Sequence, residues 1–354
     1  MSLADLKSMT LAELKSLVNA CGQPDFRALQ MYRWLQQRGV SGFEEMTDLP
    51  KEFRNALAAG SYIAGAEIER RYRSRLDDTV KYLFRMRDGQ LVESVRMRYL
   101  HGLTLCVSTQ VGCRMNCAFC ATGKSGFSRN LAPSEMLAQI QSAQADAGER
   151  ISNVVLMGMG EPLDNYDNVL RFLELVSSEE GLDIGMRHLS LSTCGIVDRI
   201  DQLAEERLQL TLSVSLHAPN NEIRSRLMPV NRRWGVEELL STCRRYAEKT
   251  GRRISFEYAM IGGVNDSGAC ARELAARLKG MLCHVNLIPV NSVKGSPFRR
   301  SSPERNRLFI RILSESGITA TVRRTLGADI DASCGQLRRR YEEEVAHVET
   351  LQQK

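Results

Sequence analysis

Residues 103–120 read LTLCVSTQVGCRMNCAFC, an apolar run followed by three closely spaced cysteines. The run LTLCVST has the length and the β-branched content of a buried strand. Five later segments have the same character: NVVLMG (153–158), HLSLST (188–193), LTLSVSLH (210–217), ISFEYAMI (254–261) and CHVNLIPV (283–290). Amphipathic helical stretches separate them. Six strands that alternate with helices predict an α/β fold, in which a parallel sheet curls into a partial (β/α)6 barrel.

Residues 1–65 are expected to form a small helical accessory domain. Thr10 and Glu13 have the spacing of a capping box ahead of an apolar helical pattern. A second helix is expected to end at Gly39, and a third to begin near Pro50. Three short helices are too few for a large core, so we expect this domain to pack against the barrel.

Residues 66–98 change character, because apolar and polar residues alternate on both sides of Asp88-Gly89. Such a dipeptide between alternating segments predicts a hairpin turn, and hence a β-meander that links the two domains. We expect the barrel to occupy residues 99–327. Residues 328–354 lack strand signals and are expected to form a loop and a charged tail.

The chain of 354 residues has a net charge of +6, and most of its 48 basic residues are arginine. The arginine side chain suits phosphate and stacks on bases, so a nucleic-acid partner and an ordinary solvated surface are about equally supported by charge alone. The expected meander carries a basic stripe, and a further run lies near the C-terminus: Arg70, Arg71, Arg73, Arg75, Arg96 and Arg98, then Arg338, Arg339 and Arg340.

The apolar runs are too short to span a bilayer, and the N-terminal residues lack the apolar core of a signal peptide. We therefore expect a cytoplasmic protein that is monomeric and makes no membrane contact. In that reducing compartment, clustered cysteines indicate metal binding or redox catalysis rather than a disulfide scaffold. Seven of the ten cysteines are scattered, as small buried residues usually are: Cys21, Cys106, Cys194, Cys243, Cys270, Cys283 and Cys334.

The clustered cysteines are Cys113, Cys117 and Cys120, which the spacing Cys-x3-Cys-x2-Cys places on one loop after the first expected strand. A structural zinc site usually has four ligands in two pairs, and the sequence has no second close pair. A distant fourth ligand would complete such a site, so zinc stays an alternative. Iron–sulfur clusters also bind thiolates, usually four. Three ligands would leave one iron open for a substrate.

This spacing after a first barrel strand is the signature of the radical S-adenosylmethionine (SAM) enzymes, which the chain resembles. Its surroundings, QVGCRMNCAFCATGKSGFSRNL, resemble the RNA methyltransferases that modify C2 of adenine in large-subunit rRNA and in tRNA. Further matches cover nearly the whole chain: GMGEPL (158–163), LSTCGI (191–196), SLHAPN (215–220), MPVN (228–231), NLIPVN (286–291) and DIDASCGQL (329–337). A C8-directed sister group linked to antibiotic resistance shares the core but departs from GMGEP and NLIPVN.

The resemblance implies a 4Fe–4S cluster on the three cysteines and two SAM molecules per turnover. It also implies a set of SAM contacts, all near expected strand ends: Glu161, Pro162, Ser192, Ser215, Leu216, His217 and Asn291. The Glu161 carboxylate is expected to meet the ammonium group of SAM. Taken singly, a strand-end serine is more often bonded to backbone, and a lone histidine such as His217 more often lies in a core.

The resemblance further assigns catalytic roles to Glu93, Cys106 and Cys334. Similar enzymes methylate Cys334, take a hydrogen from that S-methyl group with a 5′-deoxyadenosyl radical, and add the new carbon radical to C2. Cys106 then attacks the sulfur of Cys334, which releases the RNA and leaves a Cys106–Cys334 disulfide that thiols must reduce. Glu93 corresponds to the proton acceptor, although its strand position alone suggests an exposed face. Whether Glu93 or Cys106 removes the C2 proton stays open.

The expected partners are 23S rRNA, tRNA position 37, an electron donor of flavodoxin type and a thiol reductant. Two other classes of function compete with this interpretation. A zinc-stabilised RNA-binding protein would be colourless when purified without oxygen, whereas a cluster protein is brown. A radical SAM enzyme with another substrate would not need both Cys106 and Cys334.

Overall fold

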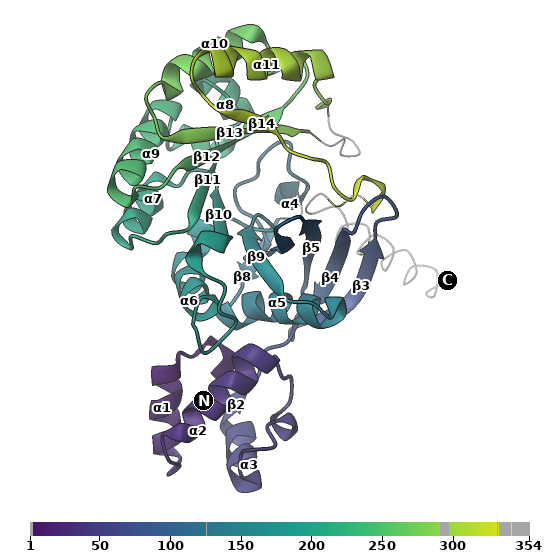
Figure 1. Ribbon diagram of the computed structural model, residues 1–354, viewed down its shortest axis with the longest axis vertical. Coiled ribbons are helices and arrows are strands. Elements are labelled where there is room, and N and C mark those ends of the chain that lie inside the picture. The colour runs from purple at the N-terminus through teal and green to yellow at the C-terminus, as the bar shows by residue number, and fades with distance from the viewer. Residues whose placement is uncertain (1–2, 125, 291–296, 331, 333–340, 342–354) are drawn as a thin grey trace.

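The computed structural model describes the chain except for residues 1–2, 125, 291–296, 331, 333–340 and 342–354 (Figure 1). Its core is a ten-stranded sheet in the order β14-β13-β12-β11-β10-β9-β6-β5-β4-β3. Seven neighbouring strands run parallel: β6 (Gly102–Cys106), β9 (Ile151–Leu156), β10 (Leu189–Thr193), β11 (Thr211–Ser215), β12 (Ile254–Met260), β13 (Cys283–Pro289) and β14 (Ala320–Val322). The predicted partial barrel is confirmed, with β14 as a short additional edge strand.

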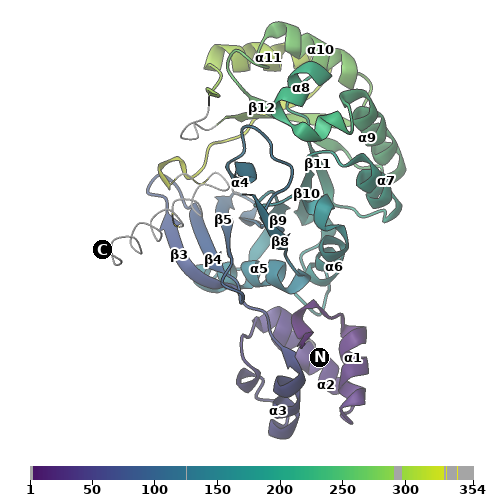
Figure 2. The ribbon, with the colours of Figure 1, turned by 180° about the vertical axis from the view of Figure 1, so that it is seen from behind.

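Helices cover the outer, convex side of the curved sheet (Figures 1 and 2). They connect successive parallel strands, as right-handed β-α-β units require. The connecting helices are α5 (Pro133–Ala147), α6 (Tyr166–Val176), α7 (Val197–Glu205), α8 (Asn221–Leu227), α9 (Val236–Thr250), α10 (Gly268–Leu278) and α11 (Pro303–Glu315). Because the helices cover the outside, the carboxyl ends of the strands and their loops surround one opening.

The meander consists of β3 (Glu67–Arg73), β4 (Val80–Arg85) and β5 (Leu91–Tyr99), which pair antiparallel. Gly89 takes the positive φ of +81° that the predicted turn between β4 and β5 requires. Strand β5 also pairs antiparallel with β6, which places Val95 opposite Cys106. The meander therefore extends the core sheet instead of standing apart from it.

The arginines of the expected basic stripe on the meander do not form a free positive surface. Arg71 and Arg73 form ion pairs with Asp146 of α5. Arg96 is buried, and Arg98 is paired with Asp78 and Glu149. The strand register places these four arginines on one face of the sheet, so the carboxylates on that side offset their charge.

The N-terminal domain contains α1 (Leu11–Ala20), α2 (Phe26–Arg33), the π-helical turn Trp34–Arg38 and α3 (Lys51–Gly60). The Thr10–Glu13 capping box is present at the start of α1. Buried polar contacts join this domain to α5, because the ammonium group of Lys7 donates to Gln141 Oε1 at 2.9 Å. The amide of Gln141 in turn donates to the carbonyls of Leu35 and Gln36.

The chain after β14 crosses to the meander through the short helix Ala328–Ile330. The Asp329 carboxylate accepts hydrogen bonds from Ser74 Oγ and Arg75 N, each at 2.7 Å. Gly327 N donates to Asp77 Oδ2 at 2.9 Å. This segment is thus anchored to the turn between β3 and β4, while Cys334 and the Arg338–Arg340 run lie outside the described residues.

Candidate functional site

A cavity of about 380 Å³ opens at the carboxyl ends of the parallel strands. It brings together most of the side chains that the sequence singled out: Cys106, Cys113, Cys117, Cys120, Glu161, Ser192, Ser215 and His217. These residues come from the loop that carries the three cysteines, from the loops after β9 and β11, and from the strands β6, β10 and β11. A volume of this size falls in the usual range for sites that bind a small molecule or cofactor.

The three clustered cysteines lie on the loop between β7 (Gln110–Gly112) and α4 (Ala121–Lys124). Backbone hydrogen bonds fix this loop, because Cys113 N donates to Gly126 O and Ala118 N donates to Leu227 O. All three thiols are partly buried and line the same cavity. The loop is therefore held in shape at both ends.

The three thiols offer the donor atoms that both iron–sulfur clusters and structural zinc sites use. Cys113, Cys117 and Cys120 line one cavity, so their chemistry fits a metal group bound beside it.

Burial sets the protonation of these thiols. It raises the pKa of Cys113 to about 12 and raises that of Cys117 further. Each neighbouring thiol and the Glu161 carboxylate add to the increase, since nearby negative charge disfavours a thiolate. Cys113 and Cys117 are therefore neutral thiols at neutral pH, and a bound cation would compensate the charge of their thiolates.

Glu161 follows β9 in the turn GMGEP and is fully buried beside the cavity. Its carboxylate accepts hydrogen bonds from Cys194 N at 2.7 Å and Leu163 N at 3.1 Å. Burial nevertheless raises the pKa of Glu161, since no cation among the described residues pairs with it. A cationic group of a bound ligand would therefore be favoured here.

The turn has no room for a side chain at Gly158 or Gly160. A Cβ on Gly158 would come within 2.7 Å of the backbone of Ser108, and Gly160 has a φ of +107°. A Cβ on Gly160 would also lie 2.6 Å from Gln110 Cβ. Larger residues would push the turn, and with it Glu161, out of position.

His217 ends the loop after β11 and takes a φ of +57°. Its Nδ1 accepts a hydrogen bond from Ala259 N at 3.0 Å, so the neutral ring carries its proton on Nε2. The edge of this ring meets Phe119 of the cysteine loop at a centroid distance of 4.9 Å. Burial, reinforced by the Arg224 guanidinium, lowers the pKa of His217 to about 3.

This lowered pKa predicts a pH dependence of stability. At pH 5 the unfolded chain protonates His217, whose ordinary pKa is 6.5, while the folded protein does not. Protonation of His217 in the unfolded chain therefore lowers the free energy of unfolding by about 2 kcal/mol between pH 7 and pH 5. The variant His217→Asn retains an acceptor and tolerates positive φ, but does not titrate. Urea unfolding measures the free energy of unfolding at pH 7 and at pH 5, and we expect the decrease between them to be smaller by this amount in the variant. An equal decrease in both proteins would contradict the lowered pKa of His217.

The structure places the remaining expected SAM contacts less uniformly. Ser192 and Ser215 line the cavity at the ends of β10 and β11. Pro162 and Leu216 are buried behind it and are not part of its lining. The backbone of Leu216 is bonded on both sides, to Glu257 O and to the Arg224 guanidinium. Asn291 lies outside the described residues.

Cys106 is buried at the end of β6 and lines the cavity. It belongs to a small hydrophobic cluster with Val95 and Met97 of β5, against which Leu326 and Ala332 of the C-terminal segment pack. No two of the nine described cysteines form a disulfide. The described part of the C-terminal segment therefore reaches the cluster that contains Cys106, and Cys334 lies outside the described residues.

The suggestion that Glu93 lies on an exposed face is wrong. Its side chain is buried on the same side of β5 as Val95 and Met97, which line the cavity. Its carboxylate forms an ion pair with the Lys81 ammonium group at 2.9 Å. Glu93 itself is not part of the cavity lining.

Sequence reasoning missed two buried charged residues at the site. Glu257 on β12 lines the cavity and accepts hydrogen bonds from Ser255 Oγ and Asn286 Nδ2. Arg224 on α8 is fully buried, and its guanidinium donates to the carbonyls of Cys194 and Ser215. A charged residue inside an apolar strand was the available signal for Glu257, whereas Arg224 looked like one of many helical arginines.

Two sequence families match the chain. The radical SAM superfamily matches residues 107–278, which contain the cysteine loop and most of the parallel strands. The family described as the ribosomal RNA large subunit methyltransferase N-terminal domain matches residues 4–63. The two matches together cover both the helical domain and the barrel.

Close relatives extend over nearly the whole chain. A protein of Thermoanaerobacter sp. (strain X514), named probable dual-specificity RNA methyltransferase RlmN, is 50% identical over 95% of this chain and 98% of its own length. The protein of that name from Caldanaerobacter subterraneus subsp. tengcongensis is 52% identical with the same coverage. A crystal structure of a radical SAM methyltransferase from Sphaerobacter thermophilus superposes with a TM-score of 0.90 at 47% identity, covering 94% of this chain and 98% of that one.

Proposed function

Because the chain belongs to the RlmN family of radical SAM RNA methyltransferases, we propose that it methylates C2 of adenosine in 23S rRNA and at position 37 of tRNA. The observation that carries the proposal is one cavity lined by three cluster-type cysteines, the buried Glu161 carboxylate and Cys106. A cytoplasmic location fits these substrates. No helix in the described ranges is long and apolar enough to cross a membrane.

Cys113, Cys117 and Cys120 would hold a 4Fe–4S cluster, and the cavity beside it would hold SAM. When bound, the cluster would supply the electron that splits SAM into methionine and a 5′-deoxyadenosyl radical. The Glu161 carboxylate lies where it can accept hydrogen bonds from the ammonium group of SAM. The neutral His217 ring can donate from Nε2 but adds no positive charge near a sulfonium.

The two catalytic thiols would be Cys106 and Cys334. C2 of adenine is electron-poor and does not attack a sulfonium methyl group, so a methyl group carried on Cys334 would be the one that reacts. Cys106 would then attack the Cys334 sulfur, which expels the methylated base and forms a disulfide. The support for this pairing is that Ala332 packs against the hydrophobic cluster that contains Cys106. A thiol reductant would restore the enzyme.

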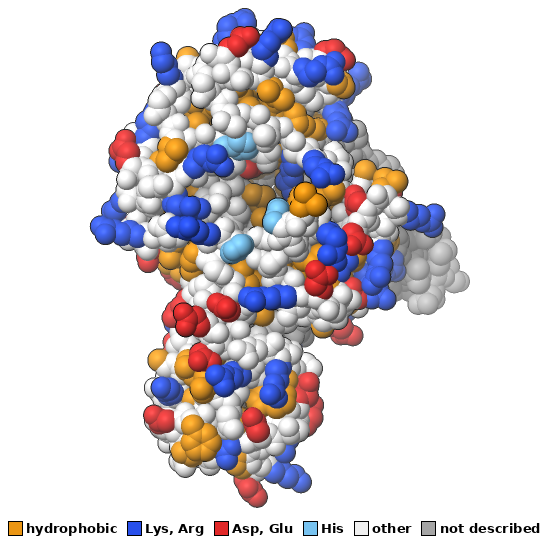
Figure 3. All heavy atoms as spheres, viewed as in Figure 1, with side chains coloured by type: hydrophobic (Ala, Val, Ile, Leu, Met, Phe, Trp, Pro, Cys, Tyr) orange, Lys and Arg blue, Asp and Glu red, His pale blue; other side chains and the backbone are white. Residues whose placement is uncertain are grey.

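Glu93 is proposed to receive the C2 proton, with Cys106 as the alternative acceptor. The Glu93 carboxylate is buried and forms an ion pair with the Lys81 ammonium group. The direction of the Glu93 side chain, shared with cavity-lining Val95 and Met97, supports this role. RNA would approach across the mouth, where Arg323 and Arg324 line the cavity and can contact phosphates. Lys and Arg side chains are spaced around the hollow in this face of the core domain (Figure 3).

The product identifies the reaction. Enzyme reconstituted with iron and sulfide, SAM, a reductant and an rRNA fragment should yield 2-methyladenosine. Chromatography of the digested RNA against 2-methyl and 8-methyl standards distinguishes the two chemistries. An 8-methyl product would place the chain with the C8-directed sister group, and unmodified RNA together with rapid 5′-deoxyadenosine formation would indicate another substrate.

A further inference from the structure

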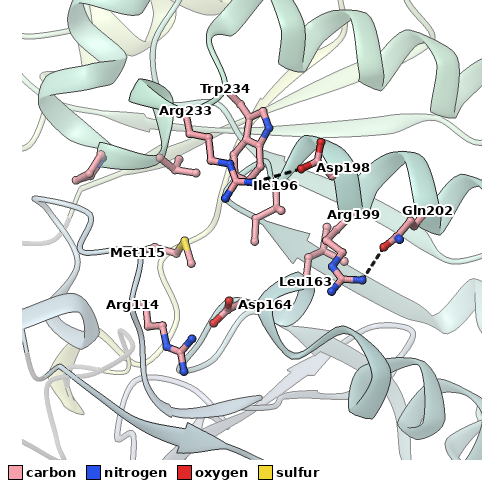
Figure 4. Close-up of a pocket in the computed structure, with 12 residues that line it drawn as sticks. Arg114, Met115, Leu163, Asp164, Ile196, Asp198, Arg199, Gln202, Arg233 and Trp234 are labelled. Carbon is pink, nitrogen blue, oxygen red and sulfur yellow. Dashed lines mark hydrogen bonds and ion pairs between the residues drawn. The ribbon is translucent and has the colours of Figure 1, made fainter.

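A second cavity, of about 690 Å³, lies on the other side of the cysteine loop (Figure 4). Its floor is apolar, with Met115, Leu163 and Ile196 pointing into the hollow. Polar side chains form the rim, and they come from the cysteine loop, from the turn after β9, from α7 and from the turn before α9: Arg114, Asp164, Asp198, Arg199, Gln202 and Arg233. Nothing in the proposed methylation chemistry uses this cavity.

The charges of the rim leave an excess of guanidinium groups. Asp164 accepts a hydrogen bond from Gln110 Nε2 at 2.8 Å, and Asp198 lies 3.5 Å from the Arg233 guanidinium. Both carboxylates therefore have partners within the protein. Arg114 lies over the Phe127 ring and Arg199 over the Tyr166 ring, and neither pairs with a carboxylate of the described residues. The rim thus presents positive charge to an approaching partner.

The second cavity is separated from the first by very little protein. Met115 lines both cavities, and it stands with Arg114 between the cluster ligands Cys113 and Cys117. The inner cavity would be filled by SAM and the target adenosine during reaction. A group bound in the outer cavity would therefore lie close to the cluster without displacing either substrate.

We propose that this outer cavity is the docking site for an acidic one-electron carrier protein. The inference rests on the proposed function, since only a reductive SAM enzyme needs such a partner. In the step assigned to this surface, the reduced carrier loses one electron and the cluster gains it. The apolar floor would receive the carrier's exposed cofactor edge, and the arginines would orient its acidic rim.

RNA is a weaker candidate for this surface. A target base must reach Cys106 in the inner cavity, whereas the outer cavity opens on the far side of the cysteine loop. Its apolar floor and two carboxylates also suit a protein surface better than a phosphate backbone. RNA binding here is retained as an outcome of the test.

The test uses the double variant Arg199→Glu/Arg233→Glu and purified bacterial flavodoxin, an acidic FMN protein. The dissociation constant of the complex between the enzyme and flavodoxin is measured with oxidised flavodoxin, so that the measurement requires no turnover of the cluster. We expect affinity to fall about tenfold or more, and its dependence on salt to weaken, because rim charges of one sign have been reversed. With limiting reduced flavodoxin, 5′-deoxyadenosine should form about tenfold more slowly, and with dithionite the rate should stay within about twofold of the parent.

The matched control is Arg307→Glu/Arg311→Glu on α11, since the side chains of Arg307 and Arg311 are 72% and 68% exposed against 71% for Arg233. This control should bind flavodoxin like the parent. Unchanged flavodoxin affinity in the Arg199/Arg233 variant, or a loss of RNA affinity alone, would overturn the docking proposal. A parent enzyme that forms no 5′-deoxyadenosine with dithionite would instead overturn the proposed function, and the binding measurement would still decide the docking site.

Discussion

The variant Cys106→Ala, incubated with SAM, a reductant and substrate RNA, is expected to accumulate as protein covalently joined to RNA. It retains the proposed methyl carrier, Cys334, and can therefore form the bond to C2. It lacks the thiol that would attack the Cys334 sulfur and release the product. Denaturing gels should show a slow band that nuclease removes, with methylated RNA reduced to at most one equivalent per enzyme.

Cys334→Ala should fail at an earlier step, with neither product nor adduct, because it has no thiol to methylate. The matched control is Cys243→Ala, since Cys243 is also a buried thiol but does not line the cavity. This control should turn over without an adduct. Repeated turnover by Cys106→Ala, with no crosslink, would show that the two roles are assigned wrongly.

The triple variant Cys113→Ala/Cys117→Ala/Cys120→Ala is expected to bind no cluster iron after anaerobic reconstitution. The variant lacks all three thiolates that would bind the irons of the cluster. Iron and sulfide analysis, together with the loss of brown absorption, provides the measurement. SAM cleavage should fall to the uncatalysed level.

The corresponding control removes three cysteines that lie outside the cavity lining, Cys21, Cys270 and Cys283. It should retain the parent's iron content, which excludes a general effect of lost thiols. Full iron retention by the cavity triple variant would refute the cluster assignment. Retention of one equivalent of zinc instead would favour the alternative of a structural metal site.

Much of the fold was predictable because buried strands and capped helices leave local signals. ISFEYAMI (254–261) contains β12 (Ile254–Met260), and the Thr10–Glu13 spacing marked the start of α1. Strand β14 was not predicted, because three partly exposed residues are too few to show an alternation of apolar and polar side chains. The strand is defined by its pairing with β13, which depends on the tertiary structure. The basic stripe is offset for a different reason. Its acidic partners include Asp146 of α5 and Glu149 after it, which the sequence alone does not place beside the meander.

The site was predictable where a residue type or spacing is unusual, as at the three clustered cysteines and the GMGEP turn. It was not predictable where function depends on contacts between distant segments. The ion pair between Lys81 and Glu93 joins two strands, and Ala332 packs against the cluster that contains Cys106 from more than half of the chain away. The outer cavity is built from four separate segments, none of which has a motif of its own.

The most direct measurement compares rRNA and tRNA from cells with and without the gene for this chain. Mass mapping of adenosines in the peptidyl-transferase centre and in the tRNA anticodon loop reports the site, and chromatography against standards reports the position of the methyl group. We expect 2-methyladenosine at both places in the parent and its loss on deletion, with recovery by the parent gene but not by Cys334→Ala. Persistence of 2-methyladenosine in the deletion strain, or loss of 8-methyladenosine in its place, would refute the proposed C2 methylation.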